Sequence, residues 1–274
     1  MDDPQDPATD PQAMPASDRA VRRWLAAAGK NVAAGGAFLG RHARDLYLSV
    51  DPDVRRHLAQ VPLLTVTLLS AREDPVAPGV PDGHPPLVFV HGLGGSRGDF
   101  VPMSWYLWIA GRKRTYRIRF APGQSLDDMA KALARFIRRV RKVTGQSQVD
   151  LVAHSLGGVV ARVAVTEHRL GTAVRTLVTL GSPHQGTWSA RFASTTKTRD
   201  LRPDSPGVLA LNAKPWPRHI RVVNVWSRND LVILPHESAL TDGAQAIDAS
   251  PFTHYSYLLD PAGWELVRKV LEEP

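Results

Sequence analysis

The residues best suited to chemistry lie in one stretch, Val149–Val160, which reads Val-Asp-Leu-Val-Ala-His-Ser-Leu-Gly-Gly-Val-Val. Its first half is an apolar run that predicts a buried strand, its second half predicts the start of a helix, and Ser155 lies at the junction. Ala153 and Gly157 flank the serine two positions away on either side, where a sharp turn has room only for small residues. This Ala-x-Ser-x-Gly pattern predicts a nucleophile elbow that exposes the hydroxyl. The alternative is an ordinary strand-to-helix turn with an incidental serine.

A serine nucleophile needs a general base within hydrogen-bond reach, and that base needs an acid to orient it. Asp230 follows the predicted strand that ends at Trp226, at the edge of a sheet where sites in α/β proteins collect. His254 lies in the loop before the last predicted helix, after the acid in chain order. We therefore predict Asp230 as the acid and His254 as the base. A turn-capping aspartate and a structural histidine are the alternative interpretations.

Other polar residues of the same region are weaker candidates. Glu237 lies farther from the strand end, Asp204 lies in a predicted irregular segment, and His236 follows Asp230 too closely to pair with it. The side chains that we expect near the substrate lie on the loops around the predicted catalytic groups: His91, Gly92, His154, His184, Trp188 and Leu209.

The turn His91-Gly92-Leu93 follows another apolar run and predicts half of an oxyanion hole, since glycine lets a loop pass close to a substrate oxygen. The amide of Leu93 and that of Leu156, at the start of the elbow helix, are the predicted donors. A phosphate-binding turn is the alternative, but neither a Gly-x-x-x-x-Gly-Lys-Ser/Thr pattern nor a complete Gly-x-Gly-x-x-Gly fingerprint is present.

Strands and helices alternate after residue 86, which predicts a mostly parallel sheet with helices on both faces. We expect strands at 87–90, 115–120, 149–154, 174–180 and 220–226. We expect helices at 96–110 and 125–144, directly after Ser155, and at 260–271. Ser125 with Asp128 three residues later predicts a capped helix start, and Asp260 with Pro261 predicts another.

The chain divides into four predicted parts. Residues 1–17 are rich in Asp and Pro and predict a disordered tail, and residues 18–72 predict a mainly helical extension. Pro62 leaves helix and strand both open for the second half of that extension. Residues 73–85 are a Pro/Gly linker, and residues 86–274 form the catalytic domain. Within it, residues 188–217 are predicted to be irregular and to form a lid or a pocket wall.

Composition limits the function classes. The 274 residues include no cysteine, which excludes a disulfide framework, thiolate metal sites and a cysteine nucleophile. The net charge is +8, and residues 1–20 contribute −4 (five Asp, one Arg), so the remainder carries +12. We interpret this positive charge as that of a solvated exterior. Binding to an anionic membrane surface is an alternative, and binding to nucleic acid is disfavoured because the basic residues are scattered.

The sequence contains no recognisable signal peptide and no membrane-spanning run, so we expect a cytoplasmic or membrane-peripheral protein. We expect neither a cofactor nor a metal. Nothing indicates its oligomeric state.

Four motifs in order resemble the bacterial serine lipases and esterases of the α/β-hydrolase superfamily, and also its inositol-deacylase-like branch. They are Phe89–Gly95 (FVHGLGG), Val152–Gly158 (VAHSLGG), Leu180–Thr187 (LGSPHQGT) and Asn229–Pro235 (NDLVILP). The resemblance covers roughly residues 86–272 and implies an α/β-hydrolase fold with Ser155 as nucleophile, Asp230 as acid and His254 as base. It also implies Leu93 and Leu156 as oxyanion donors and a segment from Leu201 to Leu211 that shapes an acyl pocket.

The expected function is hydrolysis of carboxylic esters through an acyl-enzyme, with a lipid or another ester as substrate and peripheral contact with a membrane surface. Acyl transfer, amide hydrolysis and inositol-linked deacylation are alternatives on the same fold. A non-catalytic binding module that uses its basic surface is an alternative from another class.

Overall fold

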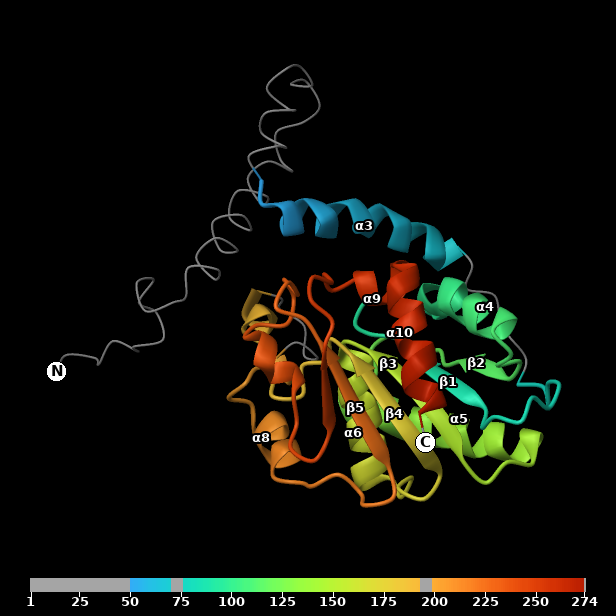
Figure 1. The fold of residues 1–274 in the computed structure, drawn as a ribbon. Helices are drawn as coiled ribbons and strands as arrows, with labels where there is room; N and C mark the ends of the chain where they lie inside the picture. The colour runs from blue at the N-terminus through green and yellow to red at the C-terminus, as the bar shows by residue number, and fades with distance from the viewer. Residues whose placement is uncertain (1–49, 70–75, 193–198, 274) are drawn as a thin grey trace. The chain divides into compact units, whose positions relative to one another are not determined.

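The computed structural model describes residues 50–69, 76–192 and 199–273. Six parallel strands form one sheet in this part of the chain, in the order β2-β1-β3-β4-β5-β6 (Figure 1). They are β1 Leu87–Val90, β2 Thr115–Arg117, β3 Val149–His154, β4 Val174–Leu180, β5 Arg221–Trp226 and β6 Gln245–Asp248. The predicted parallel sheet is thereby confirmed. The predicted tail, most of the predicted extension and residues 193–198 of the predicted lid lie outside the described residues.

Helices cover both faces of the sheet, as predicted. The helices α5 (Leu126–Thr144) and α6 (Leu156–Glu167) lie on one face, and α4 (Val101–Ile109), α9 (Ser256–Leu259) and α10 (Pro261–Glu272) lie on the other. Successive strand residues point to opposite faces, so Val88 packs toward α5 and α6 while Leu87 and Phe89 pack toward α4 and α10. Burial on both faces explains why these strands read as continuous apolar runs.

The predicted helix ends follow the capping signals. The Ser125 hydroxyl accepts a hydrogen bond from the amide of Asp128, whose carboxylate accepts one from the Ser125 amide. The same helix ends at Gly145, which has a φ of 69°. Asp260 accepts from the amide of Ala262, with Pro261 at the first helical position. Local sequence therefore determines where these helices begin and end.

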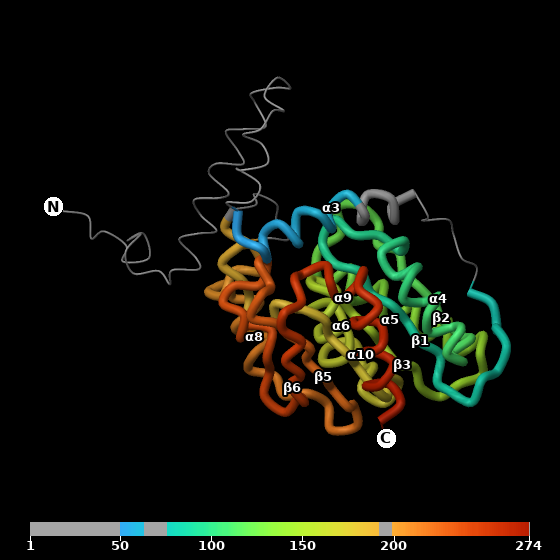
Figure 2. Tube along the Cα trace, turned by 45° about the horizontal axis from the view of Figure 1, so that its top comes forward, coloured from blue at the N-terminus to red at the C-terminus, as the bar shows by residue number. Residues whose placement is uncertain are grey.

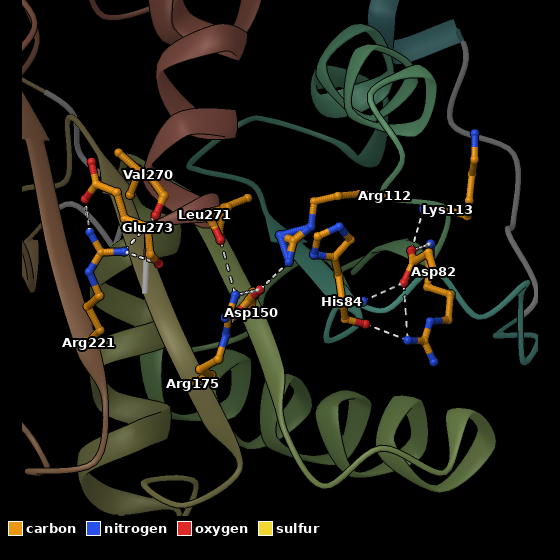
Figure 3. Close-up of polar contacts among 11 residues, drawn as sticks. Asp82, His84, Arg112, Lys113, Asp150, Arg175, Arg221, Val270, Leu271 and Glu273 are labelled. Atoms are coloured by element: carbon orange, nitrogen blue, oxygen red, sulfur yellow. Dashed lines mark hydrogen bonds and ion pairs between the residues drawn. The ribbon is translucent and has the colours of Figure 1, made fainter.

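Charged side chains form ion pairs at the end of the sheet where the strands begin (Figure 3). Asp150, at the start of β3, is fully buried and accepts hydrogen bonds from Arg175 at 2.9 and 2.7 Å and from Arg112. Arg175 also donates to the carbonyl of Leu271 at 3.3 Å. A buried carboxylate is stable only when it is paired and hydrogen-bonded, and Arg112 and Arg175 meet that need. The ion pairs of Figure 3 thus lie at the edge opposite the elbow, which begins where β3 ends.

Several short elements differ from the prediction. The segment predicted to be irregular contains the 3-10 helix η3 (Trp188–Phe192) and the helix α8 (Pro206–Asn212), which Ser205 caps through the amide of Val208. Edge strand β6 and the 3-10 helix η4 (His236–Ala239) were not predicted, and β2 is shorter than expected. The helix predicted at 96–110 consists of the 3-10 helix η2 (Arg97–Phe100) followed by α4. Apolar residues of the segment 188–217 are buried in the core: Ala190, Leu201, Val208, Leu211 and Trp216. The described part of this segment is therefore packed structure.

The helix α3 (Pro52–Leu69) continues past Pro62, which settles the open choice between helix and strand. It lies across the carboxyl ends of the strands, where it contacts η2 and α9 (Figures 1 and 2). Among residues 50–69, 76–192 and 199–273, no helix combines the length and the apolar character that crossing a bilayer requires.

Candidate active site

Ser155 occupies a strained turn between β3 and α6. Its backbone has φ 55° and ψ −129°, a conformation that costs a residue with a side chain about 1–3 kcal/mol. The Ser155 amide donates to the carbonyl of Leu180 at 2.9 Å, and its carbonyl accepts from the amide of Gly158 at 3.0 Å. The neighbouring backbone therefore holds the serine in this conformation, as the predicted elbow requires.

The glycines around the serine have no space for a side chain. A Cβ atom on Gly157 would lie 2.4 Å from the carbonyl oxygen of Val90 and 2.8 Å from that of His91. A Cβ atom on Gly92 would lie 2.8 Å from the Cβ of Ser155. The loop after β1 therefore packs backbone against backbone on the elbow, which places Leu93 and Leu156 on neighbouring strand ends.

We expect Gly157→Ala to destabilise the fold by about 1–3 kcal/mol, because the new methyl group meets backbone oxygens that cannot rotate away. The shift of the urea unfolding midpoint measures this loss. Gly207→Ala in α8 is the matched control, since a Cβ atom there meets nothing within 4 Å and helix propensity favours alanine. Equal midpoints for both variants would contradict the close packing at Gly157.

Asp230 and His254 form a buried pair. The Asp230 carboxylate lies 2.9 Å from Nδ1 of His254, and the two residues are 1% and 3% exposed. Its other oxygen accepts from the amides of Val232 at 2.9 Å and Ile233 at 3.0 Å. Burial alone would raise the pKa of Asp230, but His254 and the two amides outweigh it, so the pKa lies below its usual value. In the tautomer that carries its proton on Nδ1, His254 donates to this carboxylate.

Gly181, directly after β4, makes room for this pair. Its φ of 50° lies in the left-handed region, and a Cβ atom there would lie 2.7 Å from a carboxylate oxygen of Asp230 and 3.4 Å from Nδ1 of His254. Gly181 is not among the predicted site residues. The only available signal was a glycine at a strand end beside the Ser-Pro turn.

His154 links the elbow to the loop that carries His254. Its Nε2 donates to the carbonyl of His254 at 2.8 Å, because a carbonyl can only accept. Burial lowers the pKa of His154 to about 3, and the charge of His254 adds to that shift. His154 is therefore neutral at physiological pH and holds the His254 backbone from the elbow side.

A cavity of about 490 Å³ opens at this edge of the sheet. Six of the predicted site residues line it: Gly92, Leu93, His154, Ser155, Leu156 and His254. Asp230 lies behind His254. Apolar side chains form most of the remaining wall: Val61, Ala190, Leu201, Val232, Ile233 and Leu258. Val61 belongs to α3, a helix that was not predicted to contribute to the site.

Four predicted substrate-binding residues do not line this cavity. His91 packs edge-on against Phe120, and Leu209 is 58% exposed on α8. Trp188 lies against the guanidinium of Arg191.

His184 is the fourth and is fully buried beside Thr179, with its ring edge-on to that of Trp216. Burial lowers the pKa of His184 to about 3, with a contribution from the charge of Arg162. Its burial and lowered pKa are those of a core histidine.

Parts of the chain are similar in sequence to known proteins. Residues 114–198 match the family described as PGAP1-like alpha/beta domain. A triacylglycerol lipase of Pseudarthrobacter phenanthrenivorans is 32% identical over 117 residues, which are 39% of this chain and 35% of that protein. A triacylglycerol lipase of Burkholderia plantarii is also 32% identical over 117 residues, 39% of this chain and 32% of that protein. The chain thus spans about a third of the length of these relatives.

Solved structures superpose on a larger part of the chain than these sequence matches cover. The mature Bacillus licheniformis lipase BlEst2 superposes with a TM-score of 0.63 at 21% identity, covering 70% of this chain and 96% of that one. Aspergillus fumigatus lipase B superposes with a TM-score of 0.61 at 17% identity, covering 70% of this chain and 53% of that one. The chain has the α/β-hydrolase fold. This confirms the predicted fold class and the resemblance to lipases and esterases of that superfamily.

The family match contains Ser155 but ends before Asp230 and His254. The pairing of Asp230 with His254 is therefore a feature of the structure that lies outside this match.

Proposed function

We propose that the protein is a serine carboxylic ester hydrolase that acts on lipid or other apolar esters. One observation carries this proposal: the strained Ser155 opens into the same cavity as His254, and His254 is paired with the buried Asp230 at 2.9 Å. Nucleophile, base and orienting acid are the parts that acyl transfer to serine requires. The relatives named triacylglycerol lipases support an ester as the substrate.

In the proposed acylation step, Oγ of Ser155 attacks the ester carbonyl carbon while Nε2 of His254 takes the hydroxyl proton. Asp230 stabilises the resulting imidazolium because its carboxylate already accepts the Nδ1 proton. The amides of Leu93 and Leu156 donate to the oxygen that becomes negative, and the N-terminal end of α6 adds a partial positive charge. Loss of one such donor typically lowers kcat by about 10²–10³-fold.

The tetrahedral intermediate then collapses, the ester C–O bond breaks, and His254 gives its proton to the departing alcohol. Water attacks the acyl-enzyme in the second half-reaction, with His254 again as base. The carboxylic acid leaves and Ser155 recovers its proton. The reaction consumes one water and needs no oxidant or reductant.

The cavity wall favours an apolar acyl group. Its volume of about 490 Å³ lies within the range of about 300–1,000 Å³ that is typical of small-molecule sites. Leu201 and Leu258 contribute to its apolar wall, and the partly exposed Leu93 and Val61 also line it. A charged acyl chain would lose hydration against this apolar part of the wall.

An alkyl fluorophosphonate tests the nucleophile, because it labels a serine that a neighbouring base activates. We expect one label per chain on the peptide that contains Ser155, none on the Ser155→Ala variant, and turnover of p-nitrophenyl esters by the unchanged protein only. The ester series runs from short to long acyl chains and reports the preference of the cavity. Absence of both label and turnover would favour a non-catalytic binding module, and turnover by Ser155→Ala would exclude this serine as nucleophile.

A further inference from the structure

The helix α3 is anchored on the two loops that carry the acid and the base. Asn229, next to Asp230, donates its side-chain amide to Asp53. Arg56 donates to the carbonyl of Pro251 at 2.9 Å, three residues before His254. These contacts join residues 176 and 195 positions apart in the chain. They tie α3 to the loops beside Asp230 and His254.

Gln60 makes the contacts closest to the base. Its side-chain oxygen accepts from the hydroxyl of Thr253 at 2.6 Å, and its amide nitrogen donates to the hydroxyl of Ser256 at 3.0 Å. Thr253 and Ser256 lie on either side of His254 and are 0% and 1% exposed. Gln60 therefore bridges the short loop that holds the His254 ring.

The donors and acceptors of this bridge balance. The Thr253 hydroxyl donates to Gln60, so the 3.0 Å contact between the two hydroxyls is a bond that Ser256 donates and Thr253 accepts. The Ser256 oxygen uses its two lone pairs for Gln60 and for the amide of Thr253 at 3.1 Å. Removing Gln60 would leave the buried Thr253 hydroxyl proton without its acceptor and the Ser256 oxygen without one of its donors, a cost that favours a shift of the loop.

We propose that Gln60 is a positioning residue of the active site, which fixes the loop of His254 from the side of α3. This inference rests on the proposed hydrolase function. His154 holds the His254 backbone from the elbow, and Gln60 holds the residues on both sides of it, so the ring has one position relative to Asp230. The helix that supplies Gln60 precedes residues 114–198, which match the family, and thus adds a contact from outside that match.

The test compares Gln60→Met with Gln60→Glu. Methionine fills a similar volume but makes neither bond. A glutamate carboxylate keeps the bond that it accepts from the Thr253 hydroxyl, but it can no longer donate to Ser256 and can only accept from that hydroxyl. For a soluble short-chain ester we expect Gln60→Met to lower kcat about tenfold with KM within about twofold, since small misplacements of a catalytic group reduce the chemical step strongly. Gln60→Glu is expected to recover most of kcat.

A single-turnover measurement separates positioning from folding. The rate constant for labelling of Ser155 by excess fluorophosphonate is a property of the folded molecules alone, because unfolded chains do not react. We expect this rate constant to fall about tenfold in Gln60→Met and to stay unchanged in the control Ala59→Gln, at the exposed neighbouring position. Equal rate constants for Gln60→Met and the unchanged protein would overturn the proposal, as would equal losses in Gln60→Met and Gln60→Glu. An inactive unchanged protein would instead refute the hydrolase function itself.

Discussion

Replacing Ser155 or His254 by alanine, or Asp230 by asparagine, is expected to lower kcat for ester hydrolysis by about 10³-fold or more while the fold stays intact. Ser155→Ala removes the nucleophile, and His254→Ala removes the group that takes its proton. Asp230→Asn replaces a carboxylate that accepts the Nδ1 proton at 2.9 Å by an amide that can donate there, which favours the wrong tautomer of His254.

The three residues are expected to act as one unit. The double variant Ser155→Ala/His254→Ala should therefore be little worse than either single variant, instead of showing the product of two losses. His236→Ala is the matched control, because His236 lies in η4 and does not line the cavity. Near-normal turnover by His254→Ala, together with loss in His236→Ala, would show that the base is misassigned. Circular dichroism and unfolding midpoints establish that each variant is folded.

Acid is expected to destabilise the protein well above the pH at which carboxylates titrate. Burial lowers the pKa of His154 and His184 from the ordinary 6.5 to about 3 in the folded protein. Below pH 6.5 the unfolded chain binds these two protons and the folded chain does not, so stability is fully present above that pH and falls as the pH drops. Each histidine is expected to cost about 2 kcal/mol at pH 5. The lowered pKa of Asp230 acts in the same direction at lower pH.

His184→Gln tests this expectation, because it removes one of the two protons without touching the cavity. The variant is expected to be less stable than the unchanged protein at pH 7.5, since it disturbs packing against Trp216. That deficit should shrink by about 2 kcal/mol at pH 5, where only the unchanged protein still loses free energy through His184. Urea midpoints at the two pH values measure the difference. Parallel pH dependences for the two proteins would contradict the assignment of a neutral buried His184.

The elements that sequence predicted well carry their own local signals. β1 and β3 are short continuous apolar runs, and α5 has a capping box at Ser125 and Asp128 and a terminal glycine at Gly145. Edge strand β6 was missed because it is short and largely exposed, so no apolar pattern marks it. α8 was missed because the Ser205-Pro206 start lies among prolines and polar residues.

Local sequence signals also decided which parts of the candidate site could be predicted. Ser155 follows β3 directly, Asp230 lies four residues after β5, and His254 lies in the loop before the last helix, so their order along the chain indicated a common sheet edge. The contacts of α3 have no such signal, because Gln60 meets Ser256 across 196 positions of sequence. Nothing local distinguishes a polar residue that faces another loop from one that faces water. The burial of His184 was missed for the same reason, since its partner Trp216 lies 32 positions later.

The anchoring of α3 has a consequence for synthesis. A ribosome makes Ser155 and most strands of the sheet well before it makes Asp230 and His254, and it makes Gln60 before all of them. The contacts that complete the acid–base pair and seat α3 therefore form last and join distant parts of the chain, which makes them slow relative to local folding. A nascent chain that ends after β4 contains Ser155 but has neither Asp230 nor His254 to activate it. The proposed hydrolysis would thus begin only after residue 254 has emerged.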